Sequence, residues 1–300
     1  MSDFSIDSLE EYERKEEQQR KRSVDRSVAV FLVFFISLTI GFLIYFILNY
    51  YMNSSDNRDK GLTPIEVNNS DVRTLYSYVT YGTRGVRNNK FLFSNTVTMS
   101  SFSDSEKFYY ASQFIRPDDF VYTNEKNSYS QKIYTLSDDK IRTYMVRFFG
   151  SNVTYSNNMN LSIIFPFNMN KMNVAKMTYN VKRRGFDVVF HKHIQDEAYN
   201  PANTTYYTLL DSAFRKEDGT IIIREKVIYA SVAEIDGYFT VSLYKDFLHQ
   251  ELIDQKMNLS ANQVYNLIDW NLYPNAAYIE YTFPLSGVVY YFQSSQFVNE

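Results

Sequence analysis

An apolar stretch near the N-terminus constrains this chain more than any other feature. Residues 28–48 carry no charged side chain. A helix of that length reaches roughly 30 Å, the thickness of a bilayer's hydrocarbon core. A cleaved secretory signal has a shorter apolar region and a small-residue cleavage site, whereas this run ends in Asn49, Tyr50, Tyr51 and Met52. The stretch predicts a transmembrane helix at 27–52, with a buried helix of a soluble protein as the alternative.

Basic residues predict the orientation of this helix. Lys15, Arg20, Lys21, Arg22 and Arg26 precede the apolar stretch, and only Arg58 and Lys60 follow it at a similar distance. Lys and Arg resist translocation, so the N-terminus is expected in the cytoplasm. The sequence thus predicts a single-pass protein of the cell membrane. It has a charged helical cytoplasmic tail at 1–26, a transmembrane helix at 27–52, a linker at 53–64 and an extracytoplasmic domain at 65–300.

The composition indicates a folded domain after this stretch. Hydrophobic residues make up 45% of the chain and charged residues 22%, as in ordinary packed domains. The net charge of -3 gives no electrostatic footprint for nucleic acid. The chain has no cysteine, so the domain depends on its core rather than on disulfides. Its 27 Tyr and 24 Phe are typical of proteins from AT-rich, low-GC bacterial genomes.

Three segments have the periodicity and end signals of amphipathic helices. The first covers residues 70–79, behind a cap at Asn69 or Ser70. The second follows Ser103, which stands at capping-box spacing from Glu106. The third begins after Ser137 and ends at Gly150, a typical C-cap residue.

After Asn158 the apolar period changes from helical to strand-like. A hairpin is predicted around Gly185, and the turn dipeptides Asp218-Gly219 and Asp236-Gly237 separate three longer strands. Glu225 interrupts the apolar face of one of these strands, which an edge or a cavity would explain. A short helix is expected between Ser260 and Pro274, and a last hairpin pairs 278–283 with 288–292. Residues 247–256 give no clear pattern.

These elements predict an α+β fold. A single N-terminal transmembrane helix is followed by an extracytoplasmic domain of about three helices and then an antiparallel meander sheet. Helices that precede a run of strands pack on one face of the sheet, because neither layer alone buries its apolar residues.

Few residues are candidates for chemistry. His191 and His193 are two apart on a strand and face the same side, a spacing that metal sites use. A metal site needs three or four converging ligands, so exposed histidines at a strand end are the favoured interpretation. The chain has no phosphate loop, no nucleophile elbow and no cysteine nucleophile. No catalytic residue, metal ligand or cofactor is therefore assigned.

The hairpin tip formed by Lys182, Arg183 and Arg184 is the second candidate site. Its charge suits contact with an anionic wall polymer or with lipid headgroups, and the alternative is a solvated turn. The high aromatic content, 17%, suits a sheet surface that binds peptides or glycans. Codon bias in a low-GC genome explains the same excess without a site.

The layout resembles that of single-pass, signal-anchor envelope proteins of low-GC Gram-positive gut bacteria. The segments that carry this resemblance are "VRTLYSYV", "VRFFGSNVTY", "DGTIIIREKVIYA" and "YTFPLSGVVYYFQSS". It spans most of the chain and implies no activity. At fold level the order of elements is also similar to cystatin-like and nuclear-transport-factor-like cones, which include both enzymes and binders.

The favoured function is that of a membrane-anchored extracytoplasmic binding or interaction domain, not an enzyme. The expected partners are the lipid bilayer and an envelope protein, a peptide or a cell-wall glycan, and no nucleic acid. The alternative is an envelope-acting enzyme with its active site in a cone-like cavity. A third interpretation is a membrane-complex subunit that makes contacts through Ser37, Thr39 and Gly41.

Overall fold

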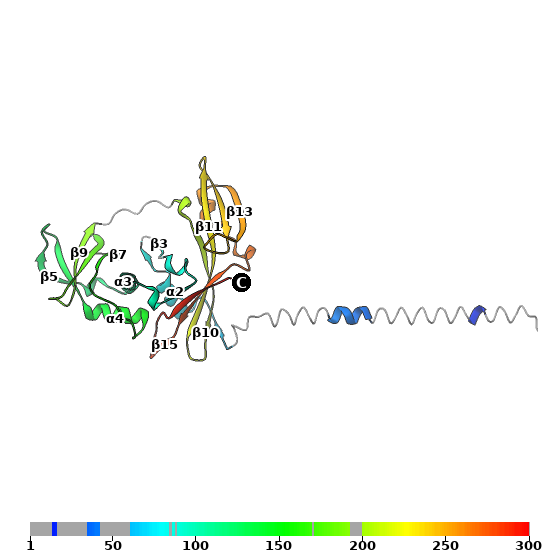
Figure 1. The fold of residues 1–300 in the computed structure, drawn as a ribbon, viewed down its shortest axis with the longest axis horizontal. Coiled ribbons are helices and arrows are strands. Elements are labelled where there is room, and N and C mark those ends of the chain that lie inside the picture. The colour runs from blue at the N-terminus through cyan, green and yellow to red at the C-terminus, as the bar shows by residue number, and fades with distance from the viewer. Residues whose placement is uncertain are drawn as a thin grey trace, which may run out of the picture. The chain divides into compact units, whose positions relative to one another are not determined.

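The computed structural model describes residues 14–16, 35–42, 61–83, 86–87, 89–169, 171–192 and 200–299. The chain divides into two compact units, Met1–Lys60 and Gly61–Glu300. The second unit holds the sheets and is drawn with its elements labelled in Figure 1.

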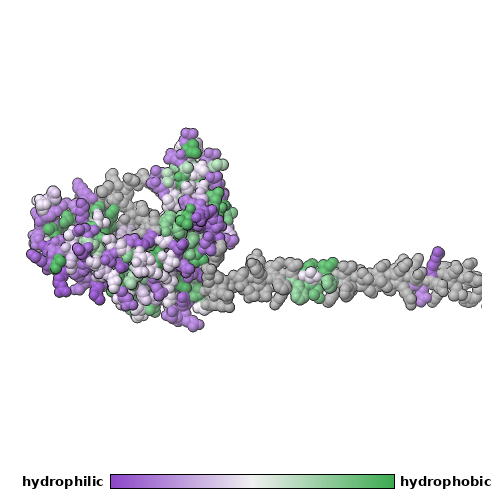
Figure 2. Space-filling model, in the orientation of Figure 1, coloured by the Kyte–Doolittle hydropathy of each residue, from purple (hydrophilic) through white to green (hydrophobic). Residues whose placement is uncertain are grey.

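In the first unit the described residues are two helical pieces, 14–16 and 35–42. The second piece exposes apolar side chains, among them Phe35, Ile36 and Phe42 (Figure 2). None of the helices in the described part of the chain has both the length and the apolar content to cross a membrane. The other residues of the predicted tail and of the predicted transmembrane helix lie outside the described residues, as do residues 53–60 of the predicted linker.

An antiparallel eight-stranded sheet forms one side of the second unit. Its main path runs β1 (Thr63–Ile65), β10 (Tyr206–Arg215), β11 (Ile221–Ile235), β14 (Tyr278–Phe283), β17 (Ser294–Val298) and β4 (Thr96–Thr98). Two strands pair with the same edge of the long strand β11. Its first half pairs with β14, and its second half pairs with β12 (Tyr238–Tyr244), which pairs in turn with β13 (Leu252–Leu259).

A five-stranded antiparallel sheet forms the other side. Its order is β5 (Val121–Lys126), β6 (Lys132–Ser137), β9 (Gly185–Lys192), β8 (Met172–Asn180) and β7 (Asn160–Met169). The predicted hairpin around Gly185 is confirmed as β8 and β9. Alternate residues on β9, namely Phe186, Val188 and Phe190, are buried on one face, as a half-buried strand requires.

Each of the three predicted helices forms with its expected cap. They are α2 (Ser70–Val79), capped by Asn69, α3 (Asp104–Ser112), with a capping box from Ser103 to Glu106, and α4 (Asp138–Phe149), capped by Ser137. Gly150 ends α4 with φ 81° and ψ 174°, a conformation that is essentially restricted to glycine.

The main core joins these helices to both sheets. Helix α2 contacts β11 of the large sheet, and α3 and α4 contact β7 and β6 of the five-stranded sheet. In Figure 1, α2 and α3 lie between the two sheets. The buried residues Leu75 of α2, Phe108 of α3, Met145 of α4, Phe186 of β9 and Tyr281 of β14 belong to one continuous cluster. The three helices and the two sheets therefore bury their apolar side chains in one shared core.

A second, smaller core lies on the other face of the large sheet. It contains Ile228 of β11, Val241 and Leu243 of β12, and Val264 of the short helix α5 (Ala261–Tyr265). The short helix predicted between Ser260 and Pro274 begins after Ser260 as expected but ends at Tyr265. Residues 247–256, which gave no pattern, contribute to β13.

The predicted fold class is wrong. The second unit is mostly β-sheet rather than helices followed by one meander, because strands precede α2, lie between α3 and α4, and form two separate sheets. The remaining elements are the small hairpin β2 (Gly82–Thr83) and β3 (Val86–Arg87) and short 3-10 turns. An N-terminal membrane-spanning helix is not among the described elements.

The predicted last hairpin is also wrong. β14 pairs with β17, not with residues 288–292. Residues between these strands leave the sheet and form a separate two-stranded hairpin, β15 (Leu285–Ser286) and β16 (Val289–Tyr290). This excursion forms one wall of the groove described next.

Candidate functional site

A groove of about 640 Å³ opens between α2, the end of α4 and the β15–β16 hairpin. We call it the helix–hairpin groove. Its lining residues are Asp71, Thr74, Leu75, Tyr78, Thr143, Val146, Arg147, Gly150, Ser151, Ser286, Val288, Val289, Tyr290 and Tyr291. The volume lies within the range of small-molecule pockets.

Helix α2 forms the first wall of the groove, since one of its faces packs on the core and the other faces the groove. Val72, Leu75 and Val79 are buried against the core, each contributing about 1.5–3 kcal/mol of hydrophobic stabilisation. Thr74 and Tyr78 lie on the face that lines the groove. The core contacts thus fix the helix, and its more polar face remains available to a ligand.

A buried carboxylate fixes α2 against the large sheet. Glu225 of β11 is fully buried and accepts hydrogen bonds from the hydroxyls of Tyr76 in α2 (2.6 Å) and Tyr281 in β14 (2.7 Å). A buried carboxylate is tolerated where such donors surround it. The break that Glu225 makes in the apolar strand pattern is therefore a polar connection inside the core, not an edge.

Helix α4 forms the second wall. Its side chains Ile141, Met145 and Phe148 are buried, while Thr143 and Arg147 are exposed along the groove. At the start of α4, the side chain of Asp119 accepts a hydrogen bond from Tyr144 (2.6 Å) and pairs with Lys140 (2.9 Å).

The Asp119 and Tyr144 contact shifts the pKa of both groups. Burial would raise the pKa of Asp119, but the bonds from Tyr144, from the Arg116 amide and from Lys140 together lower it. Burial and the bond to Asp119 raise the pKa of Tyr144 to about 12. The contact holds α4 to the turn that precedes β5.

The third wall is the β15–β16 hairpin. Ser286 pairs with Val289, so Gly287 and Val288 form a two-residue turn, and Gly287 has φ 64°. Glycine at this first turn position suits the type II′ turn of tight hairpins. Val288 at the tip is 93% exposed.

The base of this hairpin is attached to the end of α4. The Phe292 amide donates to the Phe148 carbonyl (2.7 Å). The ring of Tyr291 packs so closely on Gly150 that an added Cβ would lie 2.8 Å from it. A larger residue than glycine would push the hairpin away from the helix.

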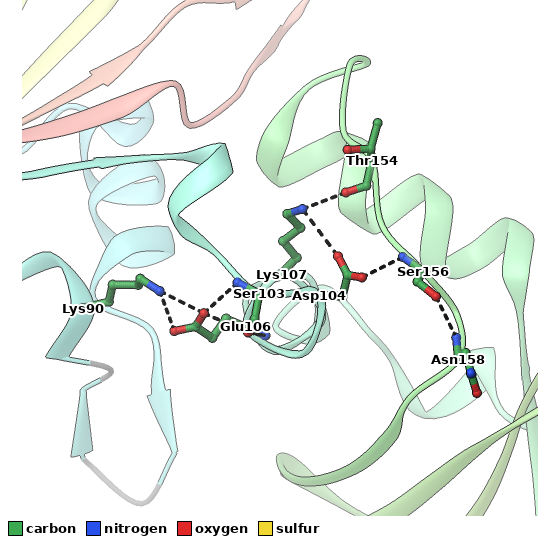
Figure 3. Close-up of polar contacts among 8 residues, drawn as sticks. All are labelled: Lys90, Ser103, Asp104, Glu106, Lys107, Thr154, Ser156 and Asn158. Atoms are coloured by element: carbon green, nitrogen blue, oxygen red, sulfur yellow. Dashed lines mark hydrogen bonds and ion pairs between the residues drawn. The ribbon is translucent and has the colours of Figure 1, made fainter.

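The chain that leaves the groove at Ser151 is anchored on α3, as Figure 3 shows. Lys107 donates to the Thr154 carbonyl (2.8 Å), and the Ser156 amide donates to Asp104 (3.0 Å). Lys107 is buried despite its charge. These bonds fix the segment that follows Gly150 and Ser151, the last groove-lining residues of this part of the chain.

The charged groups of the groove are Asp71 and Arg147. Arg147 stacks on the ring of Phe114 at 4.3 Å and donates to the Tyr78 hydroxyl at 3.2 Å. Asp71, in the first turn of α2, lies 4.0 Å from Arg215. The groove therefore has a basic residue near Tyr78 and an acidic residue at the start of the same helix.

The predicted basic tip does not belong to this groove. Arg183 is half-buried and pairs with Glu125 (2.5 Å) and Asp187 (2.7 Å). The hydrogen bond to Glu125 is the main reason that the pKa of Arg183 is raised. Lys182 and Arg184 are exposed on the turn between β8 and β9. Arg183 is thus a structural cation, and its two neighbours remain a surface candidate.

Of the two histidines predicted on one strand, the structure describes only His191. His191 lies on β9, where its ring nitrogen is 3.4 Å from the amide of Gln131, and His193 lies outside the described residues. Within the parts of the chain that the structure covers, no three His, Asp or Glu side chains are arranged to hold a metal ion.

Sequence reasoning missed the groove because its walls come from three distant segments. Two local signals were present: Gly150 as the end of α4, and the turn at Ser286-Gly287. Comparisons with protein-family models, with curated proteins and with solved structures found no match.

Proposed function

We propose that the Gly61–Glu300 unit is a non-catalytic binding module and that its ligand lies in the helix–hairpin groove. The observation that carries this proposal is a preformed groove of about 640 Å³ with aliphatic and aromatic side chains and a few polar groups. Binding pockets have this combination, since apolar surface supplies affinity and sparse polar groups fix orientation. The anchored walls favour a ligand that binds without large rearrangement.

The lining chemistry favours binding over the alternative, an envelope-acting enzyme. General acid–base catalysis needs a titratable group that is within hydrogen-bond reach of the proton it transfers and is not already engaged by another side chain. Here Asp71 lies beside Arg215, and Arg147 lies beside Tyr78, so the two charges have separate neighbours. The groove also lies between helices and a hairpin rather than inside a curved sheet, where a cone-like active site was expected. The enzyme remains an untested alternative.

The location of this module is proposed from the sequence alone. The uncharged residues 28–48 and the basic residues before them favour attachment to a cell membrane, with Gly61–Glu300 on the extracytoplasmic side. Protease added to intact cells is expected to digest this unit. Survival of the unit under conditions that digest it in lysed cells would contradict the proposed side.

A groove-filling substitution tests the binding proposal. Thr143 lines the groove, and its neighbour Arg142 is exposed on the same helix without lining it. The full-length chain is applied to a random peptide array and to an array of cell-wall glycan fragments. Thr143→Trp is expected to reduce binding to the recovered ligands at least tenfold, whereas Arg142→Trp leaves it unchanged. Equal binding by both variants, or no ligand on either array, would contradict the proposal.

A further inference from the structure

Two contacts position the guanidinium of Arg147 at the groove. Its guanidinium stacks on Phe114 at 4.3 Å and donates one bond, to the Tyr78 hydroxyl. Across the described residues no acidic side chain forms an ion pair with it. A guanidinium has five N–H donors in a planar fork, so several remain for a ligand. A carboxylate matches that fork with two parallel bonds.

The hairpin beside Arg147 offers a free strand edge. Among the described strands, β15 and β16 pair only with each other. β16 is the strand that contacts α4, and both of its residues, Val289 and Tyr290, line the groove. An unpaired edge presents backbone N–H and C=O groups, here those of Tyr290, which an added peptide strand satisfies. A glycan does not offer that regular ladder.

Apolar side chains also line the groove. Val146, Val288 and Val289 line the groove, and Val288 is almost fully exposed. Covering such surface on binding is favourable at about 25 cal/mol per Å². If a peptide strand were added to β16, its side chains that face the groove would cover this apolar surface.

The charges give the groove a direction. Asp71 and Tyr78 are separated by seven positions along α2, about 10 Å at the helical rise, and Arg147 contacts Tyr78. A strand covers that distance with about three residues. Arg147 attracts a carboxylate at its end of the groove, whereas Asp71 at the other end is itself acidic and lies 4.0 Å from Arg215. The carboxylate of a ligand is therefore expected at the Arg147 end.

We propose that the ligand is an extended peptide that adds to the edge of β16 and places a carboxylate on Arg147. This inference rests on the proposed binding function and names its ligand class. The carboxylate comes from a peptide C-terminus or from an Asp or Glu side chain. The chemistry at Arg147 is the same for both sources.

Two hexapeptide libraries, one with free C-terminal carboxylates and one amidated, distinguish these sources when they are bound to the labelled full-length chain. A C-terminal carboxylate predicts at least tenfold stronger retention on the free-acid library. An acidic side chain predicts equal retention on both, confined to members with Asp or Glu. Arg147→Ala should abolish retention and Arg147→Lys should lose most of it. Arg142→Ala, outside the groove, should lose none.

Hydrogen exchange gives a second readout that does not depend on the variants. The Tyr291 amide donates to the Pro284 carbonyl and Val289 is paired with Ser286, so the backbone of Tyr290 between them faces away from β15. A retained peptide should slow exchange at the backbone amide of Tyr290 in the wild-type chain. Retention that needs neither a carboxylate nor Arg147 would overturn this inference and leave the binding function intact. Arg147-dependent binding of glycan fragments alone would overturn the peptide class. Absence of any ligand for the groove would overturn both proposals.

Discussion

The ring of Tyr291 packs on the backbone of Gly150, 2.8 Å from where a Cβ of that residue would stand. Gly150 ends α4, and Tyr291 follows the hairpin that forms the opposite wall of the groove. The distance between α4 and the hairpin at this point thus depends on residue 150 being a glycine, which has no Cβ.

Replacing this glycine should destabilise the fold. Gly150→Ala forces a Cβ into the ring of Tyr291, with overpacking of about 1–3 kcal/mol, and adds about 1–3 kcal/mol for a conformation that disfavours side chains. Chemical denaturation followed by circular dichroism measures the loss. Gly237→Ala is the control, because Gly237 also has positive φ but has no atom near its Cβ position. An equal loss in both variants would show that Tyr291 does not crowd the site.

The tyrosines around Glu225 should contribute to stability through their hydroxyls. Tyr76→Phe or Tyr281→Phe removes one donor from a fully buried carboxylate, at an expected cost of about 1–3 kcal/mol in unfolding free energy. Tyr129→Phe, on an 83% exposed ring, should change stability by less than about 0.5 kcal/mol. Loss of the Tyr76 hydroxyl should also weaken ligand binding, since it holds α2. Unchanged melting of both core variants would contradict this role.

Local signals account for the parts of the fold that the sequence predicted. The caps at Ser103 and Ser137 and the apolar stripes behind them lie within one or two helical turns, so α3 and α4 were predicted. The turn dipeptides Asp218-Gly219 and Asp236-Gly237 similarly located β10, β11 and β12. Each signal involves neighbours in the chain, and none depends on tertiary contacts.

The missed parts depend on contacts between distant residues. β5 is exposed along almost its whole length and therefore lacks an alternating pattern. β14 skips the adjacent apolar run and pairs with β17, a choice that the strand pattern does not specify. The groove was missed for the same reason, because Tyr78, Arg147 and Val289 come together only in the folded chain.

Acid should weaken the attachment of α4 through Asp119. Its pKa in the folded state lies below the ordinary value of 3.8, so its ionised form stabilises the fold above that pH. The contribution is lost as the pH falls below 3.8 through the folded-state pKa. The difference in unfolding free energy between wild type and Asp119→Asn should stay constant above about pH 5 and shrink below pH 4.

The variant Tyr144→Phe checks the cause of this acid response. It removes the hydroxyl that helps to lower the pKa of Asp119, so the same titration should move toward the ordinary carboxyl range. Urea unfolding at a series of pH values measures both effects. A difference between wild type and Asp119→Asn that persists unchanged at pH 2 would contradict the assignment.

Val288 should separate binding from stability. Its side chain is 93% exposed at the hairpin tip, so Val288→Ser should alter the unfolding free energy by less than about 0.5 kcal/mol. The same change removes apolar surface that a bound peptide would cover, and we expect affinity for the retained peptides to fall several-fold. Val181→Ser is the matched control, because Val181 is 76% exposed on the β8–β9 turn and does not line the groove. If Val288→Ser bound these peptides as tightly as wild type, the hairpin tip would not be part of the ligand contact. Since the stability of both variants is expected to be unchanged, a loss confined to Val288→Ser reports the groove itself.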